Sequence, residues 1–193
     1  MRGLCVTEST VCEIAAGKQH FLLRTKDGSV YSFGYGFYGS LGHGNTISLT
    51  SPKKIADCSR ASKIAAAGYL SAAVSSGVLY VWGNAQIKDM PLKIFDIPAN
   101  VAISDKQGNL YEVDDVALGS SHILVLTPNK ELLSLGANKM GVLGRGTKAS
   151  LAWESEASVI LNNIISISSS SNSCAAINGT QIYSFLYLAH FYF

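Results

Sequence analysis

The chain has 193 residues, of which 48% are apolar and only 15% are charged, and its formal net charge is +2. Such a small charge argues against nucleic acid or an anionic membrane surface as the partner. No apolar run reaches the roughly 18 residues needed to span a bilayer, and the first residues lack the apolar centre of a signal peptide. We therefore expect an intracellular protein in the cytoplasm or nucleus, with a mitochondrial location left open.

A motif recurs every 51 residues after a lead-in of residues 1–10. Its copies start at a glycine or serine, and a histidine or serine stands three positions later: Gly17 and His20, Gly68 and Ser71, Gly119 and His122, Ser170 and Ser173. A fixed period of about 20 to 50 residues is typical of an array in which one supersecondary unit is copied. The period divides the chain into repeats at about 11–60, 61–112, 113–163 and 164–185.

Each repeat holds two β-prone runs around a short turn. In chain order the turns fall at 27–28, 76–77, 129–130 and 178–180, and the first is Asp27-Gly28. Such a dipeptide between two β-prone runs is a strong hairpin signal, because the turn needs residues that tolerate positive φ. No convincing amphipathic helix interrupts the pattern, so the predicted class is all-β. The second repeat adds an out-of-phase hairpin at 100–113, so the units number four by period and five by hairpin.

A glycine-rich loop follows the hairpin in the first repeat and again in the third. Its members recur at a displacement of 102: Gly34, Gly39, Leu41, Gly42 and Gly44, then Gly136, Gly141, Leu143, Gly144 and Gly146. This spacing predicts a loop with several positive-φ or close-approach positions, anchored by one buried leucine. The second repeat has no such loop at 84–89.

Nothing in the sequence assembles a catalytic or cofactor site. Residues 34–39 match the G-x-G-x-x-G of dinucleotide-binding folds, but the glycine-rich run at 40–46 cannot open the helix that this fingerprint requires. His20 and His122 lack repeated Cys, Asp or Glu partners, which indicates a structural role. Asp114 and Asp115 have no recognisable partner and point to opposite sides of an extended chain. We expect no enzymatic activity and no cofactor.

The cysteines do not form a metal-binding pattern. They are scattered and include no C-x-x-C pair: Cys5, Cys12, Cys58 and Cys174. Structural zinc needs close pairs of ligands, so the sequence predicts buried free thiols and no metal.

The pattern resembles the regulator of chromosome condensation repeat, over residues 11–185. That repeat runs from an apolar strand through Gly-x-x-His and an Asp-Gly turn to an aromatic-Gly pair and Gly-x-Leu-Gly-x-Gly. The positions that carry the resemblance here are Gly17, His20, Gly28, Gly34, Gly39, Leu41, Gly42, Gly44, Gly68, Gly83, Gly119, His122, Gly136, Gly141, Leu143, Gly144 and Gly146. The resemblance implies that the histidines bond between strands.

The family's fold is a β-propeller, usually of seven four-stranded antiparallel blades. Seven repeats of this length would need roughly 350 residues, so the resemblance implies a partial propeller of a little over half a ring. Its open end blades are expected to make the chain self-associate. Residues 186–193 abandon the repeat pattern abruptly, and we expect a truncated or mis-spliced gene product.

For function, the resemblance implies a protein-interaction module or scaffold that presents loops on a rigid β framework. The alternative is a guanine-nucleotide exchange factor for a small GTPase of the Ran type, acting through a β-wedge. The out-of-phase hairpin at 100–113 is the only candidate for such a wedge. The predicted partner is a protein of unknown identity, with a small GTPase as the narrower prediction.

Overall fold

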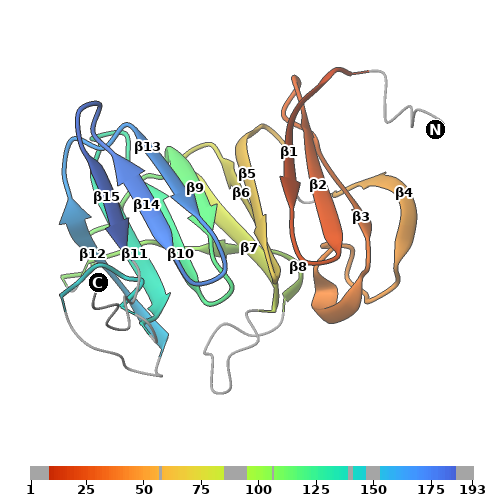
Figure 1. Cartoon of the computed structure of the whole chain (residues 1–193). Coiled ribbons are helices and arrows are strands. Elements are labelled where there is room, and N and C mark those ends of the chain that lie inside the picture. The colour runs from red at the N-terminus through yellow and green to blue at the C-terminus, as the bar shows by residue number, and fades with distance from the viewer. Residues whose placement is uncertain are drawn as a thin grey trace.

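The computed structural model describes residues 9–56, 58–84, 95–105, 107–138, 141–146 and 153–185. Within these ranges the regular structure is β, apart from the single 3₁₀ turn η1 (Phe37–Gly39). Figure 1 shows the sheets following one another from the red strands on the right to the blue strands on the left. The predicted all-β class is confirmed.

The strands form four antiparallel sheets, each paired in chain order. The first sheet contains β1 (Val11–Ala16), β2 (His20–Thr25), β3 (Val30–Gly34) and β4 (Leu49–Lys54). The second contains β5 (Ala61–Ala67), β6 (Tyr69–Ser75), β7 (Val78–Asn84) and β8 (Phe95–Val101). The third contains β9 (Asp115–Leu118), β10 (His122–Leu126), β11 (Leu132–Ala137) and β12 (Trp153–Leu161). The fourth shows three strands in the described residues, β13 (Ser166–Ser169), β14 (Cys174–Ile177) and β15 (Ile182–Phe185).

The four sheets are the blades of a partial propeller, which we number in chain order. The first strand of each blade lies innermost, and β1, β5, β9 and β13 contact one another in sequence. A propeller of seven blades would need three more than these, so the chain forms part of a ring. The predicted partial propeller is therefore confirmed.

The predicted turn between the second and third strands closes the first blade as expected. Gly28 has φ +77°, and the Asp27 carboxylate accepts hydrogen bonds from Thr25 Oγ1 at 2.5 Å and Ser29 Oγ at 2.9 Å. These hydroxyl donors stabilise the ionised carboxylate and lower the pKa of Asp27. Positive φ also marks the equivalent turns, at Gly77, Lys130 and Gly179.

Each interface between neighbouring blades encloses a buried apolar cluster. The cluster between the first two blades includes Leu22, Val30 and Trp82. The cluster between the second and third blades is the largest and includes Leu70 and Ile123. A third cluster joins the last two blades. The fold is therefore held together mainly by packing between blade faces, since each blade alone would leave these side chains in water.

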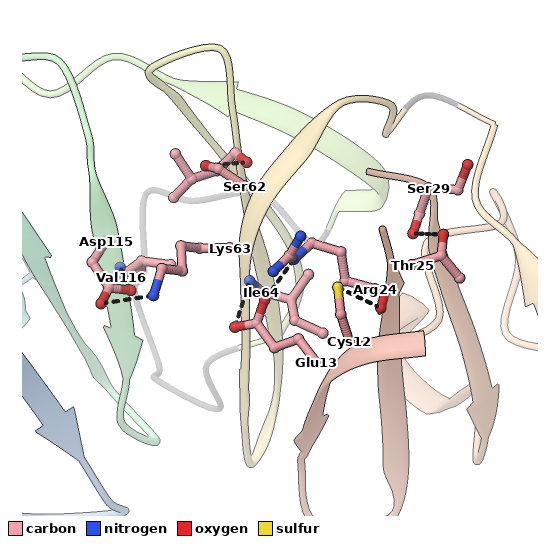
Figure 2. A network of polar contacts seen from close by, with 11 residues as sticks. Cys12, Glu13, Arg24, Thr25, Ser29, Ser62, Lys63, Ile64, Asp115 and Val116 are labelled. Atoms are coloured by element: carbon pink, nitrogen blue, oxygen red, sulfur yellow. Dashed lines mark hydrogen bonds and ion pairs between the residues drawn. The ribbon is translucent and has the colours of Figure 1, made fainter. Parts of the chain in front are cut away.

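Polar contacts join the inner strands of consecutive blades (Figure 2). Glu13 pairs with Arg24 at 2.6 Å, and its other carboxylate oxygen accepts a 3.5 Å hydrogen bond from the backbone N–H of Ile64. Lys63, next to Ile64, lies 3.5 Å from Asp115 of the third blade. Asp114 pairs with Lys130 at 3.2 Å. The prediction that Asp114 and Asp115 have no partner was wrong, because each one meets a lysine that is distant in the sequence.

The hairpin predicted at 100–113 is not a fifth blade. Asn100 and Val101 end β8, the outer strand of the second blade, and a single bridge between Ser104 and Leu110 closes the remaining turn. The Asp105 carboxylate caps this turn by accepting the backbone N–H groups of residues 107 and 109 at 2.8 and 2.9 Å. The described residues form four sheets, the number that the period predicts. The loop at 85–94 and the predicted anomalous tail at 186–193 lie outside the described residues.

The cysteines follow the prediction in part. Cys58 and Cys174 are buried, and Cys174 is a free thiol. Cys12, which was expected to be buried, is exposed on β1, where its thiol lies 3.4 Å from the carbonyl oxygen of Arg24. Cys5 lies outside the described residues.

Candidate protein-interaction face

One face of the molecule gathers the turns between the first two strands of every blade. We call it the glycine-turn face, and it comprises residues 17–19, 68–69, 119–121 and 170–173 together with the loop at 35–48. It lies at the bottom of Figure 1, and the turns at 27–28 and 178–180 lie on the opposite face. The loop at 35–48 joins it because β3 ends there, next to the start of β2.

The Gly-x-x-His sequence builds the turn in the first and third blades. The N–H of Gly17 donates to the carbonyl of His20 at 2.9 Å, and the N–H of Gly119 donates to the carbonyl of His122 at the same distance. A Cβ on either glycine would collide with Cε1 of the histidine ring that lies against it. Glycine is therefore required because the histidine ring lies so close to it. In the fourth blade Ser173 replaces the histidine, so no ring lies there and Ser170 can replace the glycine.

Both histidines link two blades. His20 Nε2 lies 2.8 Å from Ser71 Oγ of the next blade, and His122 Nε2 lies 2.7 Å from Ser169 Oγ. Burial lowers the pKa of each histidine to about 4. Cys174 Sγ lies 2.9 Å from His122, but burial raises the pKa of this thiol to about 11. A neutral imidazole beside a protonated, buried thiol gives no nucleophile.

The sequence alignment of Ser71 with His20 was wrong by one position. In the first blade Ala16 pairs with Phe21, whereas in the second Ala67 pairs with Leu70 and Ala66 with Ser71. The turn has the same length in both blades, since Ala66 and Ser71 enclose four residues just as Ala16 and Phe21 do, but the hairpin lies 50 rather than 51 residues after its counterpart. Leu70 therefore occupies the position in the second blade that His20 has in the first, and Ser71 is the hydrogen-bonding partner of His20. Spacing alone pointed to Ser71, because Gly17 and Gly68 are 51 residues apart. The paired strands around them are displaced by 50, with the same β-bulge at Val11/Glu13 and at Ala61/Lys63.

The glycine loops interlock each blade with the next. Leu41 and Leu143 are buried as predicted, and their carbonyls accept hydrogen bonds from Ser32 Oγ at 2.7 Å and Ser134 Oγ at 2.8 Å. A Cβ on Gly42 would lie 2.9 Å from Trp82 Nε1 of the following blade. Gly144 stands in the same relation to Phe185, at 2.6 Å. These loops are thus fixed between blades.

An exposed aromatic cluster stands on the rigid loop of the first blade, where sequence analysis did not predict it. Ring centroids are 5.0 Å apart for Tyr35 and Phe37, 6.5 Å for Phe37 and Tyr38, and 5.0 Å for Tyr38 and Tyr69. The three loop residues remain 47%, 52% and 43% exposed. Lys18 Nζ lies 5.3 Å from the centre of the Tyr69 ring. We call these five residues the aromatic cluster.

The signal for this cluster was the run Tyr35-Gly36-Phe37-Tyr38 inside the G-x-G-x-x-G match. The glycines of this run match a nucleotide-binding motif, whereas the aromatic residues between them are the ones that form the cluster. The structure shows one 3₁₀ turn at 37–39 and then loop, with no helix N-terminus for a pyrophosphate.

A hollow of about 360 Å³ adjoins the cluster at the propeller axis. Its lining comes from three blades and is made of small residues, hydroxyls and one lysine: Ala16, Gly17, Lys18, Ala66, Ala67, Gly68, Ser169, Ser170 and Ser171. Lys18 thus belongs to the hollow and to the aromatic cluster. Among the described residues at 16–20, 34–48, 67–71, 118–122, 136–138, 141–146 and 169–174 there is no Asp or Glu. The described part of this face is aromatic and cationic.

Two further findings concern what the described residues do not contain. Among all the residues that the structure describes, no three His, Cys, Asp or Glu side chains lie close enough together to hold a metal ion. The described residues also include no helix that is long and apolar enough to cross a bilayer.

Comparison with known proteins places this geometry in one family. Residues 11–40 and 27–74 each match the regulator of chromosome condensation (RCC1) repeat. The human E3 ubiquitin-protein ligase HERC2 is 36% identical over 137 residues, which are 66% of this chain and 3% of that protein. The chain therefore spans a small part of this relative.

Solved structures agree. The crystal structure of human WBSCR16 superposes with a TM-score of 0.78 at 23% identity, covering 93% of this chain and 48% of that one. Prp20p of Saccharomyces cerevisiae superposes with a TM-score of 0.74 at 18% identity, covering 93% and 46%. The repeated glycine turns, the interlocking loops and these matches lead to one conclusion: the chain belongs to the regulator of chromosome condensation repeat family.

Proposed function

We propose that this chain is a non-enzymatic protein-interaction module that binds its partner through the glycine-turn face. The aromatic cluster is the observation that carries the proposal. Tyr35, Phe37 and Tyr38 keep about half of their surface in water, although each ring also contacts another ring. Large aromatic side chains held rigidly at a surface are typical anchors of protein interfaces, because they bury much area with little loss of side-chain freedom.

The backbone of Tyr38 supports a binding role. It adopts φ +59° and ψ +25°, a left-handed conformation that costs a residue with a Cβ about 1–2 kcal/mol. This conformation sets the Tyr38 ring 5.0 Å from that of Tyr69 on the next blade. Strained residues of this kind concentrate at binding and catalytic sites, where the strain serves geometry rather than stability.

Charge defines the partner's chemistry. Lys18 is exposed beside the aromatic rings and at the rim of the axial hollow, and the described turns of this face carry no carboxylate. A partner segment that presents carboxylates next to apolar side chains would match both features. Prp20p, which shares the fold, was crystallised in a study of its binding to Gsp1p and histones, so its propeller supports the proposal of protein partners.

We also propose that the protein acts inside the cell. Cys174 is a free thiol although it is buried in the fold. Unpaired cysteines of this kind fit a reducing compartment such as the cytoplasm or nucleus.

Site-specific photocrosslinking tests the proposed face. A photoreactive phenylalanine analogue at position 38 keeps an aromatic ring in the cluster, and the same analogue at the exposed Thr180 probes the opposite face. We expect a discrete protein adduct from position 38 in cell extracts, no such adduct from position 180, and loss of the position-38 adduct when Lys18 is changed to Glu. Equal adducts from both positions would reject the glycine-turn face as the binding surface.

The family resemblance also predicts the alternative activity, nucleotide exchange on a small GTPase. Release of labelled nucleotide from a panel of small GTPases separates the two functions. Acceleration by the full chain would establish exchange activity, and unchanged release leaves the binding module.

A further inference from the structure

Every blade in this chain has two faces that serve different neighbours. The leading face points to the preceding blade and the trailing face to the following one. Side chains paired across adjacent strands lie on the same face, so the register assigns each residue to one of the two. Trp82 and Ala73, which lie on the leading face of the second blade, pack against Leu22 and Val30 on the trailing face of the first.

The same contact recurs at the other two interfaces. Ile123 and Leu133 of the third blade's leading face pack against Leu70 and Leu79 of the second. Cys174 and Ala176 of the fourth blade pack against Leu124 of the third. In this fold a leading face is therefore covered by the trailing face of another blade.

The leading face of the first blade has no blade in front of it among the described residues. Phe21 pairs with Phe33, and Leu23 pairs with both Ile14 and Tyr31, so these five residues share that face. The two phenylalanine rings stack at 5.1 Å. Phe21 is 39% and Ile14 64% exposed, whereas Trp82, the counterpart of Phe33, is fully buried.

No blade in the described part of the chain covers the trailing face of the fourth blade either. Ala175 pairs with Ser184 and Ser168, and Ile177 pairs with Ile182, which places these residues on that face. Ile182 is 80% exposed, although its counterpart Val30 in the first blade is fully buried. On the three described strands this face is uncharged and mostly small, and it would accept the bulky aromatic residues of a leading face.

We propose that two copies of this chain associate head to tail, with the trailing face of the fourth blade of one copy packed on the leading face of the first blade of the other. The geometry of the contact already exists three times within the chain, so a second copy needs only to continue it. Both open faces belong to the same molecule, and the small, uncharged one complements the aromatic one. This contact is heterologous, which means that each copy offers one face to each neighbour.

Three isoleucine-to-glutamate variants test the proposal by sedimentation velocity over a concentration series of the full chain. Ile14→Glu disrupts the leading face, Ile182→Glu disrupts the trailing face, and Ile47→Glu, on the loop of the glycine-turn face, is the control. All three side chains are more than 60% exposed, at 64%, 80% and 68%, so the folded monomer should tolerate each change. Circular dichroism and thermal melting verify that it does.

The expected result is a concentration-dependent oligomer for the wild type and for Ile47→Glu. Ile14→Glu and Ile182→Glu should each weaken association by about tenfold or more. An equimolar mixture of these two variants should recover association as a dimer, since one supplies an intact trailing face and the other an intact leading face. A monomeric wild type, association that survives in either single variant, or a mixture that stays monomeric would overturn the proposal.

Discussion

Glycine and histidine act as a unit at the first turn of two blades. The ring of His20 lies against Gly17 and reaches Ser71 of the next blade, so a turn residue, a ring and a neighbouring hydroxyl depend on one another. Ser71 also donates to the carbonyl of Ser40 at 2.9 Å, which accepts a second hydrogen bond from Trp82 Nε1 at 3.0 Å. Removing any member leaves buried polar atoms without partners.

Gly17→Ala should therefore destabilise the fold. The added methyl meets the His20 ring, and overpacking of this kind typically costs about 1–3 kcal/mol. Ser170→Ala is the matched control, because this position already carries a Cβ and should change the free energy of unfolding by less than about 0.5 kcal/mol. Urea titration of both variants measures the difference, and equal midpoints would contradict the account.

The two buried histidines should make stability depend on pH. Burial lowers their pKa from 6.5 to about 4, so between these values the unfolded chain binds protons that the folded chain does not. The free energy of unfolding should be nearly constant above about pH 7 and should fall by up to about 3 kcal/mol per histidine as the pH drops from 6.5 to 4.

The control for this dependence comes from the second blade, where Leu70 takes the position of the histidine. A variant with both His20→Leu and His122→Leu should lose stability at pH 7 but show a much flatter pH profile. A profile as steep as that of the wild type would assign the acid sensitivity to other groups.

Tyr38→Asn separates stability from binding. Asparagine tolerates the left-handed conformation that Tyr38 holds, so relief of strain should offset the lost ring contacts and leave the melting temperature unchanged or slightly raised. Binding of the protein crosslinked from position 38 should weaken. Tyr35→Asn, at an ordinary φ in the same cluster, is the control and should bring no gain in stability. A large loss of stability in Tyr38→Asn would contradict the view that this conformation serves binding.

At the scale of the elements, the glycine loops add to the packing between blade faces and help to fix the blades in position. The glycine loop of the first blade enters the second at Gly42, where it meets Trp82, and the loop of the third meets Phe185 in the same way. Because these glycines leave no room for a side chain, the loop can follow the neighbouring blade closely. The rigid base that results carries the aromatic cluster.

Gly42→Ala and Gly44→Ala form a matched pair for this contact. Both glycines have nearly the same φ, +75° and +74°, so the backbone penalty for alanine is shared. A Cβ on Gly42 would lie 2.9 Å from Trp82, whereas on Gly44 the nearest neighbour is 3.6 Å away. Gly42→Ala should cost about 1–3 kcal/mol more than Gly44→Ala in denaturant unfolding. Equal costs would show that the loop does not lock the blades.

At the scale of the whole molecule, the sequence predicts the parts of each blade that have a local signature. The hairpin turns and glycine loops need positive φ at fixed places, and glycines at those places reveal them. The outer strands lack such a signature. β4 reads Leu-Thr-Ser-Pro-Lys-Lys and β8 contains Pro98, and both pair only because the third strand of their blade offers an edge.

The candidate site was harder to predict than the fold. The aromatic cluster joins residues from two repeats, since Tyr38 of the first blade meets Tyr69 of the second. The residues of the cluster do not recur from repeat to repeat, so a search for repeated positions does not find them. The open end faces were predictable in principle, and the structure adds which residues form them.

The central claim is that the glycine-turn face binds a protein partner, and one titration tests it most directly. The protein crosslinked from position 38 is titrated with the wild type, with Lys18→Glu, and with Lys26→Glu, which makes the same charge change on the exposed turn of the opposite face. We predict that Lys18→Glu weakens binding by about tenfold or more, while Lys26→Glu leaves the affinity within about a factor of two. Equal affinities for the two variants would contradict the claim.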